Sequence, residues 1–286
     1  GQEAVAAGIM PLLRTDDLLL STHRGHGHTL AKGADPAAMM KELLGRQGGC
    51  CGGKGGSMHI ADFSVGMLGA NGVVGANIHI GAGAAHGAKL LGDGRIVVDC
   101  FGDGAVNRGP FLEGLNWAGV FELPILFVCE DNVYSATTRT ADMTAGAGAA
   151  ERARSFAIQT HEADGNDAEA MADLAAECIS RIRETGLPEF IHARTYRQHG
   201  HTYFDPGAYR PEGEAADRAA SDDPIKRQCE TLLAAGIGKD VLARIHADAK
   251  TEMEQALAEA TAAPWPNDDS VFADVQDIGS PAREAF

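Results

Sequence analysis

The chain of 286 residues has 44% hydrophobic and 22% charged residues, a composition that can fill a core and argues against intrinsic disorder. Its 40 acidic side chains exceed the 24 basic ones, and the net charge of −16 argues against nucleic acid as the main partner. Glycine is frequent, with 24 of its 36 residues before position 111, but it lacks the three-residue period of collagen.

The first residues and the hydropathy of the chain bear on its location. The opening GQEAVAAGIM lacks the basic start and long apolar core of a signal peptide. No apolar run reaches the roughly 20 residues that span a bilayer, so we expect no membrane partner. The six cysteines include no CxxC pair, and we expect reduced thiols in a cytoplasmic, bacterial-like compartment.

Helical and strand patterns alternate along the first two thirds of the chain. The expected elements are a helix and loop over 1–20, a helix over 35–46 capped by Asp35, a loop over 47–75, a helix over 76–91, a strand over 96–101, a helix over 113–121, a strand over 124–129, a helix over 166–185 and a strand over 190–195. Apolar strands separated by helices favour a parallel sheet that is covered on both faces.

The pattern changes near residue 212. Strand signals stop there, two helical patterns occupy 222–262, and 264–286 are expected to form an irregular tail. We therefore predict an α/β domain over 1–211, followed by a C-terminal helical extension and tail over 212–286.

Polar residues follow all three expected strands, and those after the third are 196–201 (YRQHGH). Asp103 lies in the GDG turn after the first strand, and Asn132 follows the second, 29 residues later. That separation is about one strand–helix–strand unit, so both side chains are expected at the tips of neighbouring strands. Carboxylate and amide oxygens suit Mg²⁺ and its phosphates, and Gly104 lets the backbone approach a phosphate closely.

The GDG turn followed at this spacing by asparagine is similar to the signature of thiamine diphosphate enzymes. Further motifs occur in the same order as in one family of them: residues 21–28 (STHRGHGH), 53–59 (GKGGSMH), 72–75 (GVVG) and 199–201 (HGH). Over roughly residues 1–230, the chain resembles the alpha subunit of the decarboxylating component of 2-oxo acid dehydrogenase complexes. The resemblance implies a three-layer α/β/α thiamine diphosphate-binding fold with a mainly parallel sheet.

The resemblance also implies a site for thiamine diphosphate and Mg²⁺. In the family the metal lies between the aspartate of the turn, the asparagine and a backbone carbonyl, which are here Asp103, Asn132 and Tyr134. Arg24 matches the phosphate-binding arginine, whose fork can hold two oxygens. The other implied cofactor-binding residues are His23 next to that arginine, Gly72 and Val74 at the aminopyrimidine, Gly104 and Ala105 at the diphosphate, and His201, which is also the implied catalytic residue.

The implied chemistry belongs mainly to the cofactor. A 2-oxo acid is decarboxylated, and a lipoyl group of the next component is reductively acylated, which makes the protein an oxidoreductase. The activating glutamate of the family lies on a beta subunit, so a heterotetramer of two alpha and two beta chains is implied. The second implied partner is a lipoyl-bearing acyltransferase component, and the chain alone is expected to have no useful turnover.

Two substrates stay open at this point. Pyruvate dehydrogenase (acetyl-transferring) is our main interpretation, since 199–201 followed by 205–207 (DPG) are nearer the pyruvate type. Acetoin dehydrogenase, which cleaves a C–C bond without decarboxylation, is the alternative. His23, in place of the usual tyrosine, and residues 66–72 (GMLGANG) are nearer that type.

Other interpretations concern glycine and cysteine. Residues 81–87 (GAGAAHG) superficially resemble a dinucleotide fingerprint, but the third glycine is misplaced by one, and a helix packed closely through small residues explains them better. A nicotinamide-dependent oxidoreductase is therefore a remote alternative, as is a non-catalytic paralog. Cys50 and Cys51 are adjacent in a glycine-rich loop, and with the nearby histidines they fit no familiar zinc spacing.

Overall fold

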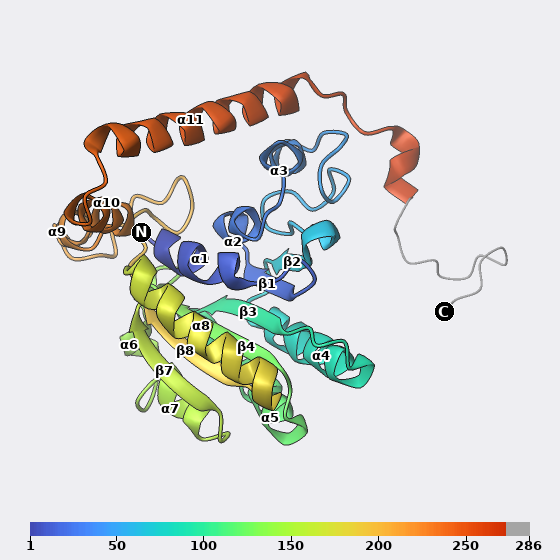
Figure 1. Ribbon diagram of the computed structural model, residues 1–286, viewed down its shortest axis with the longest axis vertical. Coiled ribbons are helices and arrows are strands. Elements are labelled where there is room, and N and C mark those ends of the chain that lie inside the picture. Colours follow the sequence, from blue (N-terminus) through green and yellow to red (C-terminus); the bar gives the residue numbers. More distant parts are fainter. Residues whose placement is uncertain (273–286) are drawn as a thin grey trace.

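A parallel sheet forms the centre of the molecule. The computed structural model describes residues 1–272, and within them six strands pair in parallel in the order β2-β1-β3-β4-β8-β7 (Figure 1). The strands are β1 (Leu18–Thr22), β2 (Met67–Asn71), β3 (Val97–Gly102), β4 (Ile125–Asp131), β7 (Gln159–Asp164) and β8 (Glu189–Arg194). A separate hairpin pairs β5 (Tyr134–Ser135) with β6 (Thr138–Arg139). The predicted α/β class is confirmed.

Helices cover both faces of this sheet, each over its own apolar core. Along β3, Val98 packs into one core with α8 residues such as Ile182, while Val97 packs into the other with Ile78 of α4 and Phe111 of α5. The helices are α1 (Glu3–Ile9), α2 (His26–Ala31), α3 (Pro36–Leu43), α4 (Ala76–Leu91), α5 (Gly109–Phe121), α6 (Thr140–Met143), α7 (Ala149–Arg154), α8 (Ala168–Thr185), α9 (Glu214–Ser221), α10 (Pro224–Ala234) and α11 (Lys239–Ala262). Short 3₁₀ turns are η1 (Met10–Leu12), η2 (Phe63–Val65), η3 (Asp103–Asn107) and η4 (Asp268–Phe272).

The strands that were expected are the central ones. The expected strands over 96–101, 124–129 and 190–195 correspond to β3, β4 and β8, with bounds that differ by one or two residues. Asp35 caps α3 as expected, because its carboxylate accepts hydrogen bonds from the amides of Ala37 and Ala38. The expected helix over 113–121 begins earlier, at Gly109.

Three strands of the six-stranded sheet lie outside the expected set, as does the small β5–β6 hairpin. The expectation of loop is wrong for β1 and β2, and β7 lies in a segment where we expect no element. β7 is a polar edge strand (QTHEAD) with mostly exposed or half-buried residues, so it lacks the apolar run of a buried strand. β2 follows Gly66, which has a left-handed φ of 75°, and itself contains a glycine, which weakens the strand signal.

The expected helix over 76–91 is α4, and its glycines differ in what surrounds them. A Cβ on Gly81 would lie 3.2 Å from the Cβ of Asp99, so this glycine lets α4 approach β3 closely. Gly83 and Gly87 have open space at that position among the described residues, so they pack on nothing within this chain, and close packing across a subunit interface stays a prediction. All three lie inside the helix instead of at a strand-to-helix turn, where a dinucleotide fingerprint would have to be.

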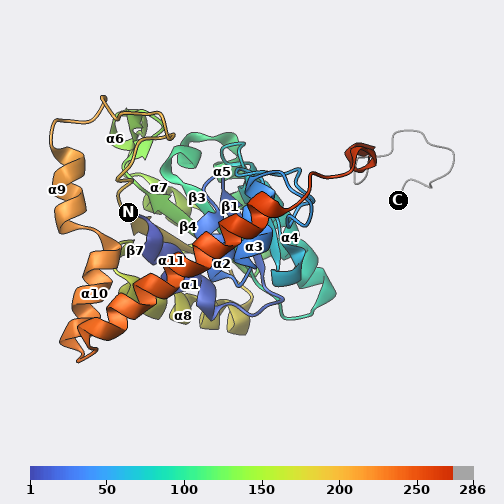
Figure 2. The ribbon, with the colours of Figure 1, turned by 90° about the horizontal axis from the view of Figure 1, so that it is seen from above.

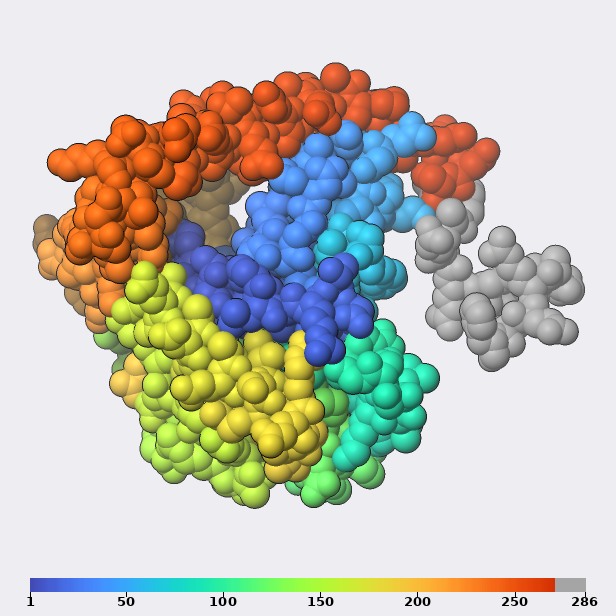
Figure 3. Space-filling model, in the orientation of Figure 1, coloured from blue at the N-terminus to red at the C-terminus, as the bar shows by residue number. Residues whose placement is uncertain are grey.

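The C-terminal part forms a helical arm over the domain. α11 crosses above α1 and α2 and packs on α3, as Figures 1 and 2 show. Figure 3 shows a hollow under the middle of this helix, between it and the N-terminal segments.

The predicted domain boundary between residues 211 and 212 stays a prediction. Of the expected tail over 264–286, residues 268–272 form η4 and residues 273–286 lie outside the described part. Between residues 1 and 272, no helix is long and apolar enough to cross a membrane.

A fully buried carboxyl group lies between β3 and α4. Within residues 1–272, neither oxygen of Asp99 has a hydrogen-bond partner. Burial raises the pKa of Asp99 to about 8, because the surroundings cannot solvate a carboxylate. The folded chain therefore holds this proton over a pH range, from about 4 to about 8, in which the unfolded chain releases it. Stability contributed in this way is complete below that range and is lost as the pH rises through it.

We expect Asp99→Asn to flatten the dependence of stability on pH. Between pH 5 and pH 8 the free energy of unfolding of the native chain should fall, relative to that of the variant, by up to about 1.4 kcal/mol per pH unit. Urea unfolding at several pH values measures this difference. Asp173→Asn, an exposed change on α8, is the matched control. Parallel pH curves for the native chain and Asp99→Asn would contradict the assignment.

Candidate active site

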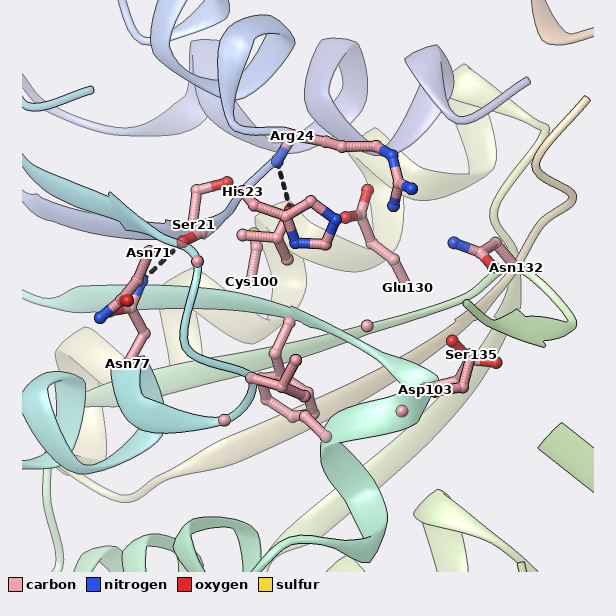
Figure 4. Close-up of a pocket in the computed structure, with 18 of the residues that line it drawn as sticks. Ser21, His23, Arg24, Asn71, Asn77, Cys100, Asp103, Glu130, Asn132 and Ser135 are labelled. Atoms are coloured by element: carbon pink, nitrogen blue, oxygen red, sulfur yellow. Dashed lines mark hydrogen bonds between the residues drawn. The ribbon is translucent and has the colours of Figure 1, made fainter. Parts of the chain in front are cut away.

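A pocket opens at the carboxyl ends of β1, β3 and β4, with a cavity of about 280 Å³ (Figure 4). The end of a parallel sheet is where ligands bind in open α/β folds. The residues that the sequence predicts for the site all line it: His23, Arg24, Gly72, Val74, Asp103, Gly104, Ala105, Asn132, Tyr134 and His201. The structure therefore brings together segments that lie up to 178 residues apart in the sequence.

The turn after β1 supplies a positive charge. The backbone amide of Arg24 donates to Thr22 Oγ1 at 3.1 Å. The Nη2 atom of the Arg24 side chain donates to the backbone carbonyl of His201 at 2.8 Å and to Nδ1 of the His201 ring at 3.0 Å. Burial, and then the charge of Arg24, lowers the pKa of His23 to about 4 and lowers the pKa of His201. Both rings are therefore neutral near pH 7, and a bound anion would meet the arginine charge.

The ends of β3 and β4 supply oxygen ligands. The two strands are neighbours with Gly102 opposite Glu130, so Asp103 and Asn132 follow adjacent strand ends, as predicted. Burial raises the pKa of Asp103 to about 6, and the Thr140 hydroxyl donates a hydrogen bond to its carboxylate. The Asn132 side chain accepts from the Tyr134 amide at 3.3 Å.

The backbone between Asn132 and Tyr134 is constrained. Val133 has a φ of 78°, in the left-handed region that a β-branched residue rarely adopts. Its amide is held by the Asp131 carboxylate at 3.1 Å, and its carbonyl accepts from the amide of Thr140 at 2.9 Å. Such outliers cluster at binding and catalytic sites, where the surrounding structure holds them.

Two glycine turns leave backbone uncovered on opposite sides of the pocket. A Cβ on Gly104 would lie 2.3 Å from Ser135 Oγ, so this position is restricted to glycine unless Ser135 moves. Across the pocket, Gly75 has a φ of 84° and begins α4. The Asn77 side chain fixes that turn, since its Nδ2 donates to the Ser21 carbonyl at 2.6 Å.

Several lining or supporting residues were not predicted. Gln2 accepts a hydrogen bond from the Asn132 side chain at 3.1 Å, and Glu130 lies 3.4 Å from the ring of the buried His28. Burial lowers the pKa of His28, but the nearby Cys100 and Glu130 outweigh this effect and raise that pKa well above its ordinary value. Gln2 lies outside every quoted motif, and His28 ends the motif over 21–28, but only the sheet topology shows which groups they meet.

Orphaned polar atoms around the pocket indicate that it is built for a ligand. Within residues 1–272, His23 Nε2 is buried without a hydrogen-bond partner, as are Nε and Nη1 of Arg197. Arg197 comes after β8 and donates its Nη2 to the carbonyl of Ala136 at 2.7 Å. Buried polar groups are normally paired, so unpaired polar atoms on His23, which lines the cavity, and on Arg197, which contacts the lining residue Ala136, favour a polar or anionic occupant.

Comparison with known proteins identifies the family of the chain. Residues 1–268 match the family model described as dehydrogenase E1 component. The chain belongs to this family. It is 44% identical over 276 residues to the alpha subunit of acetoin:2,6-dichlorophenolindophenol oxidoreductase from Cupriavidus necator. The aligned region covers 96% of this chain and 83% of that relative.

Two further relatives of this E1 chain show the range of substrates. The alpha subunit of acetoin:2,6-dichlorophenolindophenol oxidoreductase from Bacillus subtilis is 40% identical, with 96% of this chain and 82% of the relative covered. The pyruvate dehydrogenase E1 alpha subunit of Zymomonas mobilis is 35% identical, with 96% and 78% covered. The chain is thus an oxidoreductase subunit of a thiamine diphosphate-dependent family whose alpha subunits pair with beta subunits. Our preference for pyruvate over acetoin finds no support in these identities.

We expect Arg24→Lys to weaken binding of inorganic pyrophosphate, in the presence of Mg²⁺, by at least about tenfold. Lysine keeps the charge but loses the planar fork, and a hydrogen bond to a charged group contributes about 1.5–3 kcal/mol. Isothermal titration of the protein with pyrophosphate measures the change. Arg95→Lys, on a half-buried arginine paired with Asp93, is the matched control. Equal affinities for Arg24→Lys and the native chain would remove Arg24 from the anion site.

Proposed function

We propose that this E1 chain is the alpha subunit of a thiamine diphosphate- and Mg²⁺-dependent enzyme that acts on acetoin. The observation that carries the proposal is the convergence of Arg24, Asp103 and Asn132 on one pocket, opposite the glycine turn over 72–75. Acetoin is favoured as substrate because the two quoted relatives named for acetoin are more identical to the chain than the pyruvate relative.

The pocket residues fit this cofactor by their chemistry. Oxygen ligands for Mg²⁺ would come from the Asp103 carboxylate, the Asn132 amide and the Tyr134 carbonyl, a hard set that this ion prefers. The diphosphate would lie against Arg24 and the amides of Gly104 and Ala105, where the absence of a Cβ at Gly104 lets it come close. The aminopyrimidine would lie against the backbone of Gly72 and Val74. His23 and His201 complete the set of cofactor contacts.

Thiamine diphosphate, when bound, supplies the carbon nucleophile that cleaves a bond beside the substrate carbonyl. The chain itself binds and orients. His201 is the catalytic residue in this proposal, since its amide is held by the Asp205 carboxylate at 2.5 Å and its ring by Arg24 at the pocket. Its lowered pKa keeps the ring neutral, so it can offer a hydrogen bond to substrate without adding charge.

A beta subunit would complete the site. The cofactor-gripping residues lie on this chain, whereas the glutamate that activates the cofactor in the family lies on the beta subunit. Exposed apolar side chains extend from the pocket turn at Val73 and Val74 onto α5 at Trp117 and Val120, and such surfaces mark protein contacts. We assign this face to the beta subunit, in a heterotetramer of two alpha and two beta chains that passes an acyl group to a lipoyl-bearing acyltransferase in the cytoplasm.

Pyruvate is the second candidate substrate. The loop of His201 continues into Asp205-Pro206-Gly207, as in the pyruvate type, and its Asp205 holds the His201 amide. The same cofactor site serves both reactions, so the choice depends on the part of the site around His23 and His201. A nicotinamide enzyme is less well supported, because 81–87 lie inside α4.

We expect Asp103→Asn to weaken Mg²⁺-dependent binding of thiamine diphosphate by more than about a hundredfold, since even outer-shell partners of a metal contribute roughly 10–100-fold. Calorimetric titration with and without Mg²⁺ measures this. Asp248→Asn, an exposed carboxylate on α11, is the matched control. Retained affinity in Asp103→Asn would overturn the metal assignment.

Substrate choice can be measured with the complete enzyme. We expect the chain, co-expressed with its beta subunit, to reduce 2,6-dichlorophenolindophenol fastest with acetoin, compared with pyruvate, 2-oxobutanoate and branched 2-oxo acids. The chain alone should give no turnover, because the activating glutamate is missing. A preference for pyruvate would replace the first substrate by the second, and robust turnover by the lone chain would overturn the dependence on a beta subunit.

A further inference from the structure

Two adjacent cysteines lie in the glycine-rich loop that follows α3. Cys50 and Cys51 are both half-buried and free, and their sulfur atoms lie within 4.8 Å of each other and of a carboxylate oxygen of Glu42. The loop belongs to the blue-to-cyan segments beside α3 in Figure 1. The proposed function uses neither thiol.

Glu42 is the anchor of this loop. Its side chain is fully buried, and its two oxygens accept four backbone hydrogen bonds, from Cys51 and Gly53 at 2.8 Å each, Gly55 at 2.7 Å and Gly56 at 3.1 Å. Because each carboxylate oxygen already accepts two hydrogen bonds, neither is available to bind a metal ion. The cluster therefore offers two sulfur atoms and no third ligand, which argues for thiol chemistry over metal binding.

The Cys51 sulfur is held in a polar setting. It accepts a hydrogen bond from the Ala61 amide at 2.9 Å and donates to the Ala61 carbonyl at 3.2 Å. The hydrogen bond from the Cys50 thiol, followed by that amide, lowers the pKa of Cys51, although burial and the charges of Glu42 and Asp62 oppose this. The same thiol contact raises the pKa of Cys50. Cys51 is thus the more reactive of the two.

The loop is joined to the candidate active site through residues 58–61. Met58 lines the pocket, and the His59 ring lies 3.4 Å from the position of a Cβ on Gly72. The Ile60 carbonyl accepts from the Ala70 amide of β2 at 2.7 Å. The Cys51 sulfur is hydrogen-bonded to the backbone of Ala61, at the end of this short segment. A change in these hydrogen bonds can therefore shift the segment and the pocket wall at Gly72.

We propose that Cys50 and Cys51 form a reversible disulfide with each other on exposure to hydrogen peroxide, and that its formation weakens cofactor binding. The Cys51 thiolate attacks one peroxide oxygen, the O–O bond breaks, and the departing hydroxide takes up a proton to become water. The Cys50 sulfur then attacks the resulting sulfenic sulfur, the S–S bond forms, and the S–O oxygen leaves as a second water with the Cys50 proton. Two electrons pass from the two thiols to peroxide.

The disulfide removes the hydrogen that Cys51 donates to the Ala61 carbonyl, and it ties the sulfur to Cys50. Adjacent Cα atoms are about 3.8 Å apart, which is less than the separation of about 4.4–6.8 Å that disulfides usually span. The ring is therefore strained and readily reduced, as expected of a regulatory disulfide. Glycine at 48, 49, 52 and 53 on both sides of the pair lets the backbone adjust.

The test uses the complex of this chain with its beta subunit. The complex is treated with hydrogen peroxide, remaining thiols are alkylated, and the chain is digested with trypsin. Both cysteines lie in one peptide, residues 47–54 (QGGCCGGK). We expect this peptide to lose two hydrogens and to resist alkylation until a reductant is added, and we expect thiamine diphosphate affinity to fall at least about fivefold and to recover with reductant.

Variants separate this pair from other thiols. Cys50→Ser keeps every contact of Cys51 to Ala61, so it should bind cofactor as the native chain does and lose the response to peroxide. Cys229→Ala removes a half-buried lone thiol and should leave the response intact. A peptide in which both thiols are alkylated after treatment, or carry only higher acids, overturns the disulfide.

A disulfide that forms without changing cofactor affinity overturns its coupling to the pocket, a part of the inference that rests on the proposed cofactor. Failure of the reduced complex to bind thiamine diphosphate would instead contradict the proposed function. In that case the peptide masses still decide whether the disulfide forms. The two failures are therefore distinguishable.

Discussion

The parallel pairing of β3 with β4 is the constraint on which the rest of this structure depends. Because Gly102 lies opposite Glu130, the next residues of both strands emerge side by side, and oxygen ligands from distant parts of the chain share one cavity. This arrangement buries most of the Asp103 carboxylate, and the burial destabilises its charged form and raises its pKa. Such a position is stabilised when a cation is close by, which supports the proposed Mg²⁺ site at this sheet edge.

The central part of the fold could be predicted from the sequence for a clear reason. β3, β4 and β8 are buried on both faces, so their apolar residues form continuous runs that are easy to recognise. β7 is held mainly by its pairing with β8, and its residues are partly exposed, so its sequence resembles that of a loop. Packing against the completed sheet, and not local preference, makes it a strand.

The site divides in a similar way. Residues within short motifs, such as Asp103, Asn132 and Arg24, could be named because their spacing resembles a known family. Gln2 could not, because a glutamine near the first residue reaches the pocket only through the tertiary fold. Arg197 follows the expected strand over 190–195, but only the structure shows its contact with Ala136, which lines the pocket. The unpaired nitrogens of Arg197, which has no such motif, were visible only in the structure.

The arm formed by α11 has a consequence for the order in which this protein can be completed. Gln47, at the start of the cysteine loop, donates its amide to the Pro264 carbonyl at 2.9 Å, and Arg46 lies 3.7 Å above the Trp265 ring. Residues 46 and 47 are therefore fixed by residues that are synthesised more than 200 positions later. The sheet can assemble during synthesis, but the loop that carries Cys50 and Cys51 gains these contacts only after residues 264 and 265 have been made.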